Sequence, residues 1–336
     1  MTRLRPIPLT GVPRPAGALP LAGSATVCFL QVERLRRGAA PEIVGIADLD
    51  PVDLERLSSR RPPVLNLTLD RPRLMGILNV TPDSFSDGGR FLAPDAAQAR
   101  AAAMAADGAE VIDIGGESTR PGAATVPAEE EIARIAPVIR AVAAGGPPVS
   151  VDTRKAPVAA AALAAGAALV NDVSAFAYDP DMAGLAAARG VPVCLMHAQG
   201  RPETMQRDPR YDDVLLDVLD HLEDRIAAAE AAGIPRRRIV IDPGIGFGKT
   251  QEHNLALLAR LSAFHDLGCA LLLGASRKRF IGTIGGTGVA EGRGPGSLAV
   301  ALAAAAQGVH FLRVHDVAET RQALALWRAA TTGETG

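Results

Sequence analysis

From Pro72 onward, short apolar runs alternate with longer segments rich in alanine and leucine at helical spacing. The short runs have the length of strands and the longer segments the length of helices, so the pattern predicts strand–helix units around a parallel sheet. Helices are expected at Asp95–Ala106, Ala128–Ala144, Asp212–Ala232 and Val317–Ala330. Eight strands are expected, at Leu74–Asn79, Glu110–Gly115, Pro148–Asp152, Ala168–Asn171, Pro192–His197, Ile239–Asp242, Ala270–Ala275 and Val309–Arg313.

Eight such units in about 260 residues match a (β/α)8 TIM barrel, which typically has about 250 residues. A doubly wound open sheet is the alternative that periodicity alone leaves open. The strand ends favour the barrel, because nearly every apolar run stops at a polar residue and a barrel brings these ends to one mouth. The polar strand ends are Asn79, Asp113 with Glu117 shortly after, Asp152, Asn171–Asp172, His197, Asp242, Ser276 with Lys278, and Arg313 with His315.

Residues 1–71 differ in character from the barrel region. They hold nine prolines, short β-like runs at Thr26–Val32 and Glu42–Ala47, and a basic cluster of Arg34, Arg36 and Arg37. We predict a small N-terminal extension over residues 1–71, followed by one (β/α)8 domain over residues 72–336. The sequence of the extension indicates no function.

Composition and charge limit the kinds of molecule that this protein is expected to bind. A formal net charge of −2 gives no general attraction to nucleic acid or anionic membranes, and one Trp and two Tyr argue against a stacking platform for single strands. No apolar run reaches the roughly 18 residues of a transmembrane helix. Three widely spaced cysteines without a CxxC pair favour a reducing compartment. We therefore expect small-molecule substrates, no nucleic-acid or membrane partner, and a cytoplasmic location.

The spacing of the glycines argues against two familiar nucleotide-binding motifs. The segment Gly244–Thr250 superficially suggests a phosphate loop, but Pro243 stands where a P-loop requires glycine, and Lys249 occupies the last glycine of GxGxxG. The Asp242-Pro243-Gly244 sequence is typical of a strand end followed by a tight turn. His197 and His315 have no metal-ligand spacing to a carboxylate, which argues against a tightly held transition metal. A Mg²⁺ ion brought by a phosphate-bearing substrate stays open.

The strand-end side chains suit a flat heterocycle. Single strand-end polar residues are often ordinary caps, and Asn79 taken alone is compatible with such a role. Asp152 and Asp242, however, end strongly apolar strands, and a buried carboxylate needs a partner such as the paired donors of an N–C–N edge. Asn171 has a donor and an acceptor for a neighbouring amide edge, while Lys278 and Arg313 supply cationic cover. We therefore expect a planar, nitrogen-rich ligand in the mouth.

Two loops near the predicted mouth are rich in glycine and hydroxyl groups. They are residues 81–89 and 115–123, and they are either plain surface connections or mobile lids that gather around an anion. Arg120 in Ser118-Thr119-Arg120-Pro121-Gly122 is the natural phosphate contact of the second loop.

Taken together, these segments resemble the dihydropteroate synthases, enzymes that join p-aminobenzoate to a pterin diphosphate. The resemblance covers the barrel from Leu74 to Val317, with the matching pieces in the family's order. They are Asn79-Val-Thr-Pro-Asp-Ser-Phe-Ser-Asp-Gly-Gly89, Gly115-Gly-Glu-Ser-Thr-Arg-Pro-Gly122, Ser150-Val-Asp-Thr153, Asn171-Asp-Val173, Asp242-Pro-Gly-Ile-Gly-Phe-Gly-Lys249, Ser276-Arg-Lys278 and Arg313-Val-His315.

The resemblance implies a (β/α)8 fold, a homodimer, and loss of diphosphate through a cation-like state before the arylamine attacks. It assigns the catalytic roles to Asn79, Arg120, Asp152 and Lys278. The implied pterin contacts are Asp152, Asn171, Met196, Asp242, Lys278 and Arg313. The diphosphate, with Mg²⁺ as cofactor and Asn79 as its ligand, is assigned to Asn79, Arg120, Arg313 and His315. The p-aminobenzoate pocket is assigned to Phe85, Thr119, Pro121, Phe247 and Lys278.

One position departs from the family pattern. Many relatives have serine after Ser276-Arg277-Lys278, where its hydroxyl helps to hold the p-aminobenzoate carboxylate, and this chain has Arg279. Arg279 can still receive a carboxylate, but it puts the geometry of this pocket and the response to sulfonamides in question.

Two rival functions are considered. A methyltetrahydrofolate-binding methyl transferase uses a related barrel but needs neither the two loops nor a diphosphate site. A silent paralogue that binds only pterin or a protein partner would be expected to lack Asn79, Arg120, Asp152 or Lys278, and this chain retains all four.

Overall fold

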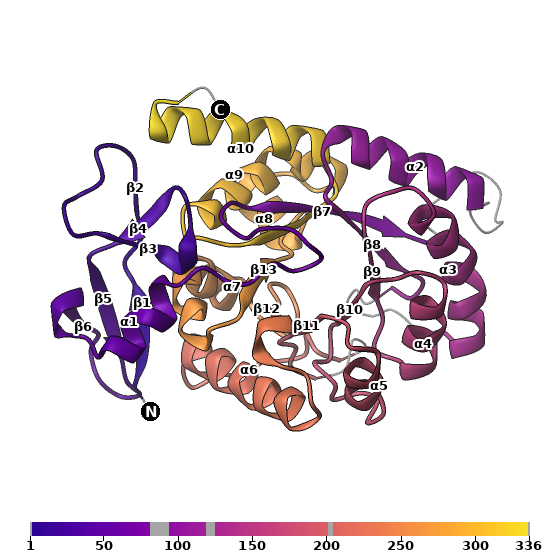
Figure 1. Ribbon diagram of the computed structural model, residues 1–336, viewed down its shortest axis with the longest axis horizontal. Helices are drawn as coiled ribbons and strands as arrows, with labels where there is room; N and C mark the ends of the chain where they lie inside the picture. The colour runs from indigo at the N-terminus through magenta and orange to yellow at the C-terminus, as the bar shows by residue number, and fades with distance from the viewer. Residues whose placement is uncertain (1, 81–93, 119–124, 201–203, 335–336) are drawn as a thin grey trace.

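The computed structural model describes residues 2–80, 94–118, 125–200 and 204–334. Eight parallel strands close into a barrel in which each strand pairs with the next along the chain and the last pairs with the first (Figure 1). This closure confirms the predicted TIM barrel and excludes the open sheet. The barrel strands are β7 (Arg73–Asn79), β8 (Val111–Gly115), β9 (Val149–Asp152), β10 (Leu169–Asp172), β11 (Val193–Met196), β12 (Ile239–Asp242), β13 (Ala270–Leu273) and β14 (Phe311–Val314).

Helices surround the barrel, and the four predicted from sequence are present with small shifts at their ends. Between strands and helices lies an apolar layer that includes Ile112, Ile114, Ile135 and Ile139, all fully buried. The helices are α2 (Pro94–Asp107), α3 (Ala128–Ala143), α4 (Ala156–Ala164), α5 (Met182–Arg189), α6 (Val214–Ala231), α7 (Gln251–Leu258), α8 (Arg279–Gly285), α9 (Gly294–Ala305) and α10 (Val317–Thr332). In the part of the chain that the structure describes, none of these helices combines the length and apolarity that a membrane crossing requires.

The interior of the barrel is layered. Side chains along a strand alternate between its two faces, so residues two apart point the same way. A lower layer is apolar, with members such as Val111, Leu169 and Val240, and it packs on Val64 and Leu69 from the segment before β7. Two residues further along these strands, the same face carries Asp113, Asn171 and Asp242. The barrel is therefore filled at one end and polar at the other.

The N-terminal residues form two small antiparallel sheets beside the barrel (Figure 1). One has the order β1-β5-β6 and the other β2-β4-β3, and helix α1 (Pro51–Ser58) follows them. Their apolar core includes Leu4, Leu21 and Phe29, against which Trp327 of α10 packs. The strands are β1 (Arg3–Pro6), β2 (Leu9–Thr10), β3 (Leu19–Pro20), β4 (Val27–Phe29), β5 (Gln31–Leu35) and β6 (Glu42–Gly45).

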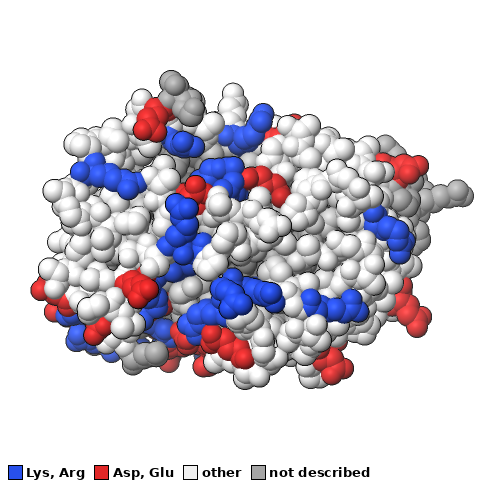
Figure 2. All heavy atoms as spheres, in the orientation of Figure 1, with Lys and Arg blue, Asp and Glu red and all other residues white. Residues whose placement is uncertain are grey.

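Arginines dock this extension on the acidic side of α6 and on the 3₁₀ helix η5 (Leu261–Leu267). Arg3, with a side chain only 3% exposed, donates to Asp220 at 2.7 Å and to Glu223 at 3.3 Å. Arg56 pairs with Asp266 at 2.7 Å. On the face shown in Figure 2, several basic and acidic side chains likewise lie next to each other rather than forming a uniformly basic surface. Arg3 and Arg56 are thus used in ion pairs that join the extension to the barrel domain.

We predict that Arg3→Met lowers the free energy of unfolding by about 2 kcal/mol, because it removes charge-assisted hydrogen bonds from a buried guanidinium. Chemical denaturation measures this. The control is Arg36→Met, since the side chains of Arg36 and its partner Glu42 are both 53% exposed and such pairs contribute little. Equal stability of the two variants would contradict a docking role for Arg3.

Candidate active site

Strand ends from all around the barrel meet at its mouth. The register places Asn171 opposite Asp152, so these two side chains are neighbours on adjacent strands. Gly115, which has no side chain, lies on β8 between Asn79 and Asp152. Met196 and Asp242 are likewise opposite each other at the ends of β11 and β12. The parallel topology thus brings the strand ends Asn79, Asp152, Asn171 and Asp242 to one end of the barrel, as the strand-end pattern predicts.

At the centre of the rim, Arg313 bridges two carboxylates. Its Nε lies 2.6 Å from Asp113 Oδ2, and its Nη2 lies 2.8 Å from Asp152 Oδ2. Asn171 Nδ2 donates to the same Asp113 oxygen at 3.2 Å. Asp113 was expected at a strand end but was assigned no binding role from the sequence. Its position two residues after the buried Val111, on the inward face of β8, is the signal that could have identified it.

Arg313 and Asn171 use only one oxygen of the Asp113 carboxylate and one of the Asp152 carboxylate. Asp113 Oδ1 and Asp152 Oδ1 are buried and have no hydrogen-bond partner among the described residues. Buried polar atoms are nearly always paired, so two such acceptors at one place indicate a site for hydrogen-bond donors. The pair suits a ligand edge that carries N–H groups.

Burial also changes the protonation of the rim. It raises the pKa of Asp152 to about 7, since the positive charge of Arg313 offsets the loss of solvent only in part and Asp113 adds negative charge. Burial likewise raises the pKa of Asp242, against the opposing effects of the Gly244 N–H at 2.7 Å and of Lys278. Burial thus favours the protonated form of both carboxyl groups.

Lys278 and Phe247, both assigned to the p-aminobenzoate pocket, lie against each other. The ammonium of Lys278 stands 3.9 Å from the centre of the Phe247 ring, a cation–π contact. Arg279 is the first residue of α8, and its side chain is exposed. His315 Nδ1 lies 3.0 Å from the hydroxyl oxygen of Ser276, which ties the ends of β13 and β14 together.

The turn that carries Phe247 is built on a buried lysine. The Lys249 ammonium lies 2.8 Å from His197 Nδ1 and donates to the carbonyls of Gly244 at 2.9 Å and Phe247 at 3.1 Å. Burial and the nearby Lys249 lower the pKa of His197 to about 2, so the imidazole is neutral and accepts at Nδ1. Gly244 has φ +68°, and a side chain there would collide with the His197 carbonyl. The predicted tight turn is confirmed, whereas the role of Lys249 was missed.

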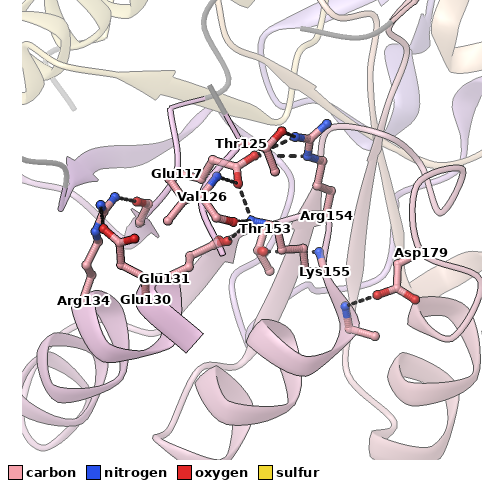
Figure 3. Close-up of polar contacts among 12 residues, drawn as sticks. Glu117, Thr125, Val126, Glu130, Glu131, Arg134, Thr153, Arg154, Lys155 and Asp179 are labelled. Atoms are coloured by element: carbon pink, nitrogen blue, oxygen red, sulfur yellow. Dashed lines mark hydrogen bonds and ion pairs between the residues drawn. The ribbon is translucent and has the colours of Figure 1, made fainter. Parts of the chain in front are cut away.

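Behind the rim, Glu117 is buried in a second group of charges with Arg154, Lys155 and Glu131 (Figure 3). The sequence placed Glu117 at a strand end, but not in this group. Four residues assigned from the resemblance lie outside the described residues, namely Phe85, Thr119, Arg120 and Pro121.

The described residues were also compared with what metal binding and thiol chemistry require. Among the described residues, no three His, Cys, Asp or Glu side chains are grouped in a way that could hold a metal ion. Cys28, Cys194 and Cys269 are buried and free.

Comparison with known proteins gives consistent matches. The model of the family described as pterin binding enzyme matches residues 75–315, well over half of the chain. The dihydropteroate synthase of Escherichia coli (strain K12) is 47% identical over 270 residues, which cover 80% of this chain and 95% of that protein. Residues 1–74 lie outside the matched family region.

Solved structures agree in fold and in sequence. A Xanthomonas albilineans dihydropteroate synthase with 4-aminobenzoic acid superposes with a TM-score of 0.74 at 51% identity, covering 79% of this chain and 94% of that one. The enzyme from the same organism in complex with 7,8-dihydropteroate gives a TM-score of 0.71 at 49% identity, covering 79% and 95%.

The raised pKa of Asp152 predicts a pH-dependent stability. Between the ordinary value of 3.8 and about 7, the unfolded chain releases a proton that folded Asp152 keeps, so stability falls as pH rises through this range. Relative to Asp152→Asn, the wild type should lose up to roughly 4 kcal/mol from pH 4 to pH 7. Denaturation at a series of pH values measures the difference, and parallel curves for the two proteins would contradict it.

Proposed function

The chain belongs to the pterin-binding enzyme family, as a dihydropteroate synthase, and we propose that the mouth bounded by Asp113, Asp152 and Arg313 is where it condenses a dihydropterin diphosphate with p-aminobenzoate. The observation that carries this placement is the pair of unsatisfied buried carboxylate oxygens on Asp113 and Asp152 beside one guanidinium. Carboxylates match the paired N–H donors of a pterin, and a planar guanidinium can stack on its ring.

In this proposal the pterin lies on the rim of the mouth. Its polar edge forms hydrogen bonds with Asp152, Asn171 and Asp242. Met196 and Lys278 lie beside the ring. Arg313 is held by the carboxylates of Asp113 and Asp152, so a ring that takes over Asp152 as an acceptor leaves the guanidinium face for stacking. The proton held by Asp152 near neutral pH gives this carboxyl group a second way to adapt to the ring.

The diphosphate would be held by Asn79, His315 and Arg313, and by Arg120 from the loop after β8. The fit to Mg²⁺ rests on donor chemistry: Asn79 ends β7 at the mouth with an amide oxygen, and Mg²⁺ on a diphosphate needs only one or two protein oxygens. When bound, Mg²⁺ would neutralise charge on the leaving diphosphate. Charge grows on that group as its bond breaks, so the contacts of His315 and Arg313 strengthen in the transition state.

The p-aminobenzoate would lie between Phe247 and Lys278, with its carboxylate toward Arg279 and its amine toward the pterin methylene. The reaction breaks the bond between the methylene carbon and the diphosphate oxygen before the amine nitrogen forms its bond to the carbon and loses a proton. This route needs no covalent nucleophile. It needs the polar rim to stabilise positive charge on the pterin and the loops, with Phe85, Thr119 and Pro121, to keep water away.

Three broader predictions accompany this function. We propose that residues 72–336 are the catalytic domain and residues 1–71 an extension docked on it. We also propose a homodimer and a cytoplasmic location. Nucleic acid and membranes have no place in this proposal.

The direct test of the function is product formation. The purified chain, given 6-hydroxymethyl-7,8-dihydropterin diphosphate, p-aminobenzoate and Mg²⁺, should form 7,8-dihydropteroate, measured by chromatography. Omitting Mg²⁺ with a chelator present should slow the reaction strongly, because the diphosphate then leaves with less of its charge neutralised. Binding of the pterin diphosphate without product would instead favour the silent paralogue, and an unchanged rate without Mg²⁺ would remove the metal from the proposal.

Single substitutions test the assigned pterin contacts. Asp152→Asn and Lys278→Ala should each lower kcat/KM by at least about 100-fold, since the first removes a carboxyl acceptor and the second removes a positive charge from the reacting site. Both variants should stay folded by circular dichroism. Asp48→Asn, an exposed carboxylate on the extension, is the matched control and should keep its activity. Near-normal turnover by both rim variants would remove the proposed pterin site.

A further inference from the structure

Lysine is scarce in this chain and unevenly placed. Of the 35 basic residues only Lys155, Lys249 and Lys278 are lysines, and all the others are arginines. Each lysine closely follows a barrel strand, respectively β9, β12 and β13. Lys278 belongs to the proposed substrate site and Lys249 supports the Phe247 turn. Lys155 is the one whose role is still unassigned.

Lys155 lies in the buried group of charges behind the rim, three residues after Asp152 (Figure 3). Its side chain is 8% exposed. The ammonium donates to the carbonyl of Val126 at 2.6 Å and to Glu131 Oε2 at 2.7 Å, and it also pairs with Glu117. One ammonium thus connects the residues on both sides of the loop after β8 to the first turn of α3.

Glu117 completes the connection from the other side. Its Oε2 accepts the N–H of Val126 at 3.1 Å, and its Oε1 accepts Arg154 Nη2 at 2.8 Å. Arg154 also donates to the hydroxyl of Thr125 at 3.2 Å. Residue 117 and residues 125–126 are therefore fastened to the same pair of cations, on the chain just after β9.

The charges in this group balance. Glu117 and Glu131 face Lys155 and Arg154. Burial alone would raise the pKa of Glu117, but the hydrogen bonds from Lys155 and Val126 keep it below its ordinary value, so this carboxylate is charged. Removal of one cation would leave a buried carboxylate without its partner, which is strongly unfavourable.

The three acceptors of Lys155 belong to three separate residues: a backbone carbonyl and two carboxylates. An ammonium has three donors arranged as a tripod, whereas a guanidinium presents its donors in one plane. The three separate acceptors of Lys155 therefore match an ammonium better than a guanidinium. This difference makes arginine a discriminating substitution.

We propose that Lys155 is a positioning residue that clamps the two ends of the loop after β8 and thereby sets the loop's contribution to p-aminobenzoate and diphosphate capture. The inference rests on the proposed function, because Thr119, Arg120 and Pro121 lie between the clamped ends. The strand that places Asp152 on the rim also places the clamp, so pterin binding and loop position are fixed by one element.

The kinetic test distinguishes an effect on the loop after β8 from an effect on the pterin contacts at the rim. Lys155→Met keeps the length of the side chain and removes the charge. It should raise KM for p-aminobenzoate by about 10-fold or more, a loss of about 1.4 kcal/mol in binding. The affinity for 6-hydroxymethyl-7,8-dihydropterin, which lacks the diphosphate, should stay within about 2-fold by calorimetry. Lys155→Arg should fold but leave KM raised, because its planar donors cannot serve all three acceptors.

The matched control is Arg56→Met, which removes a cation from the largely buried Asp266 far from the loop. It should lower stability and leave KM unchanged. An unchanged KM in Lys155→Met would overturn the proposal, as would an equal loss of affinity for the pterin without diphosphate. Full recovery of KM in Lys155→Arg would overturn the claim that the tripod of donors matters.

A second readout does not depend on activity. Hydrogen exchange of the backbone over residues 116–127 should be faster in Lys155→Met than in the wild type, relative to the rest of the barrel. If Lys155→Met does not fold, Arg154→Gln takes its place, with a smaller effect expected on the same segment. Unchanged exchange there would refute the clamp. A wild type that forms no dihydropteroate would refute the proposed function alone.

Discussion

The polar mouth of this barrel depends on one guanidinium shared between two carboxylates. Asp113 and Asp152 stand on adjacent strands, offset by two residues in the register, and both are buried. Two negative charges in such a place repel each other and resist desolvation. Arg313, delivered from β14 with donors at 2.6 Å and 2.8 Å, makes their proximity tolerable and still leaves one oxygen of each for a ligand. The same arrangement therefore offsets the repulsion between the two carboxylates and leaves two unpaired acceptors at the mouth.

The barrel and much of its rim could be predicted from the sequence because they follow from local patterns. All eight strands lie where short apolar runs occur, since such runs are buried between the barrel interior and the helices. The polar strand ends meet because parallel strands point the same way. Small errors at the ends have local causes: the strand expected to reach Ala275 stops at Leu273, just before the loop that turns toward Lys278.

Other features could not be read from the sequence because they join distant residues. Arg3 pairs with Asp220, which is 217 positions away in the sequence. The local sequence around either residue gives no indication of this contact. Lys155 and Lys249 resemble ordinary polar residues of strand-to-helix connections, and only the fold shows that both are buried among acceptors. The role of Asp113 was within reach, because alternation on β8 places it directly above Val111. Asp113 is not the last residue of β8, which ends at Gly115, so a pattern of strand-end residues does not single it out.

The distribution of amines has a practical consequence for chemical labelling. Lys155 and Lys249 are buried, whereas Lys278 at the mouth is only half-buried. A reagent that acylates primary amines therefore meets essentially one accessible lysine on the folded protein, apart from the α-amino group, and that lysine lies at the proposed substrate pocket. The rate at which Lys278 is acylated can be followed by mass spectrometry. A ligand in the mouth should lower this rate, so the measurement reports binding without a coloured substrate and without turnover.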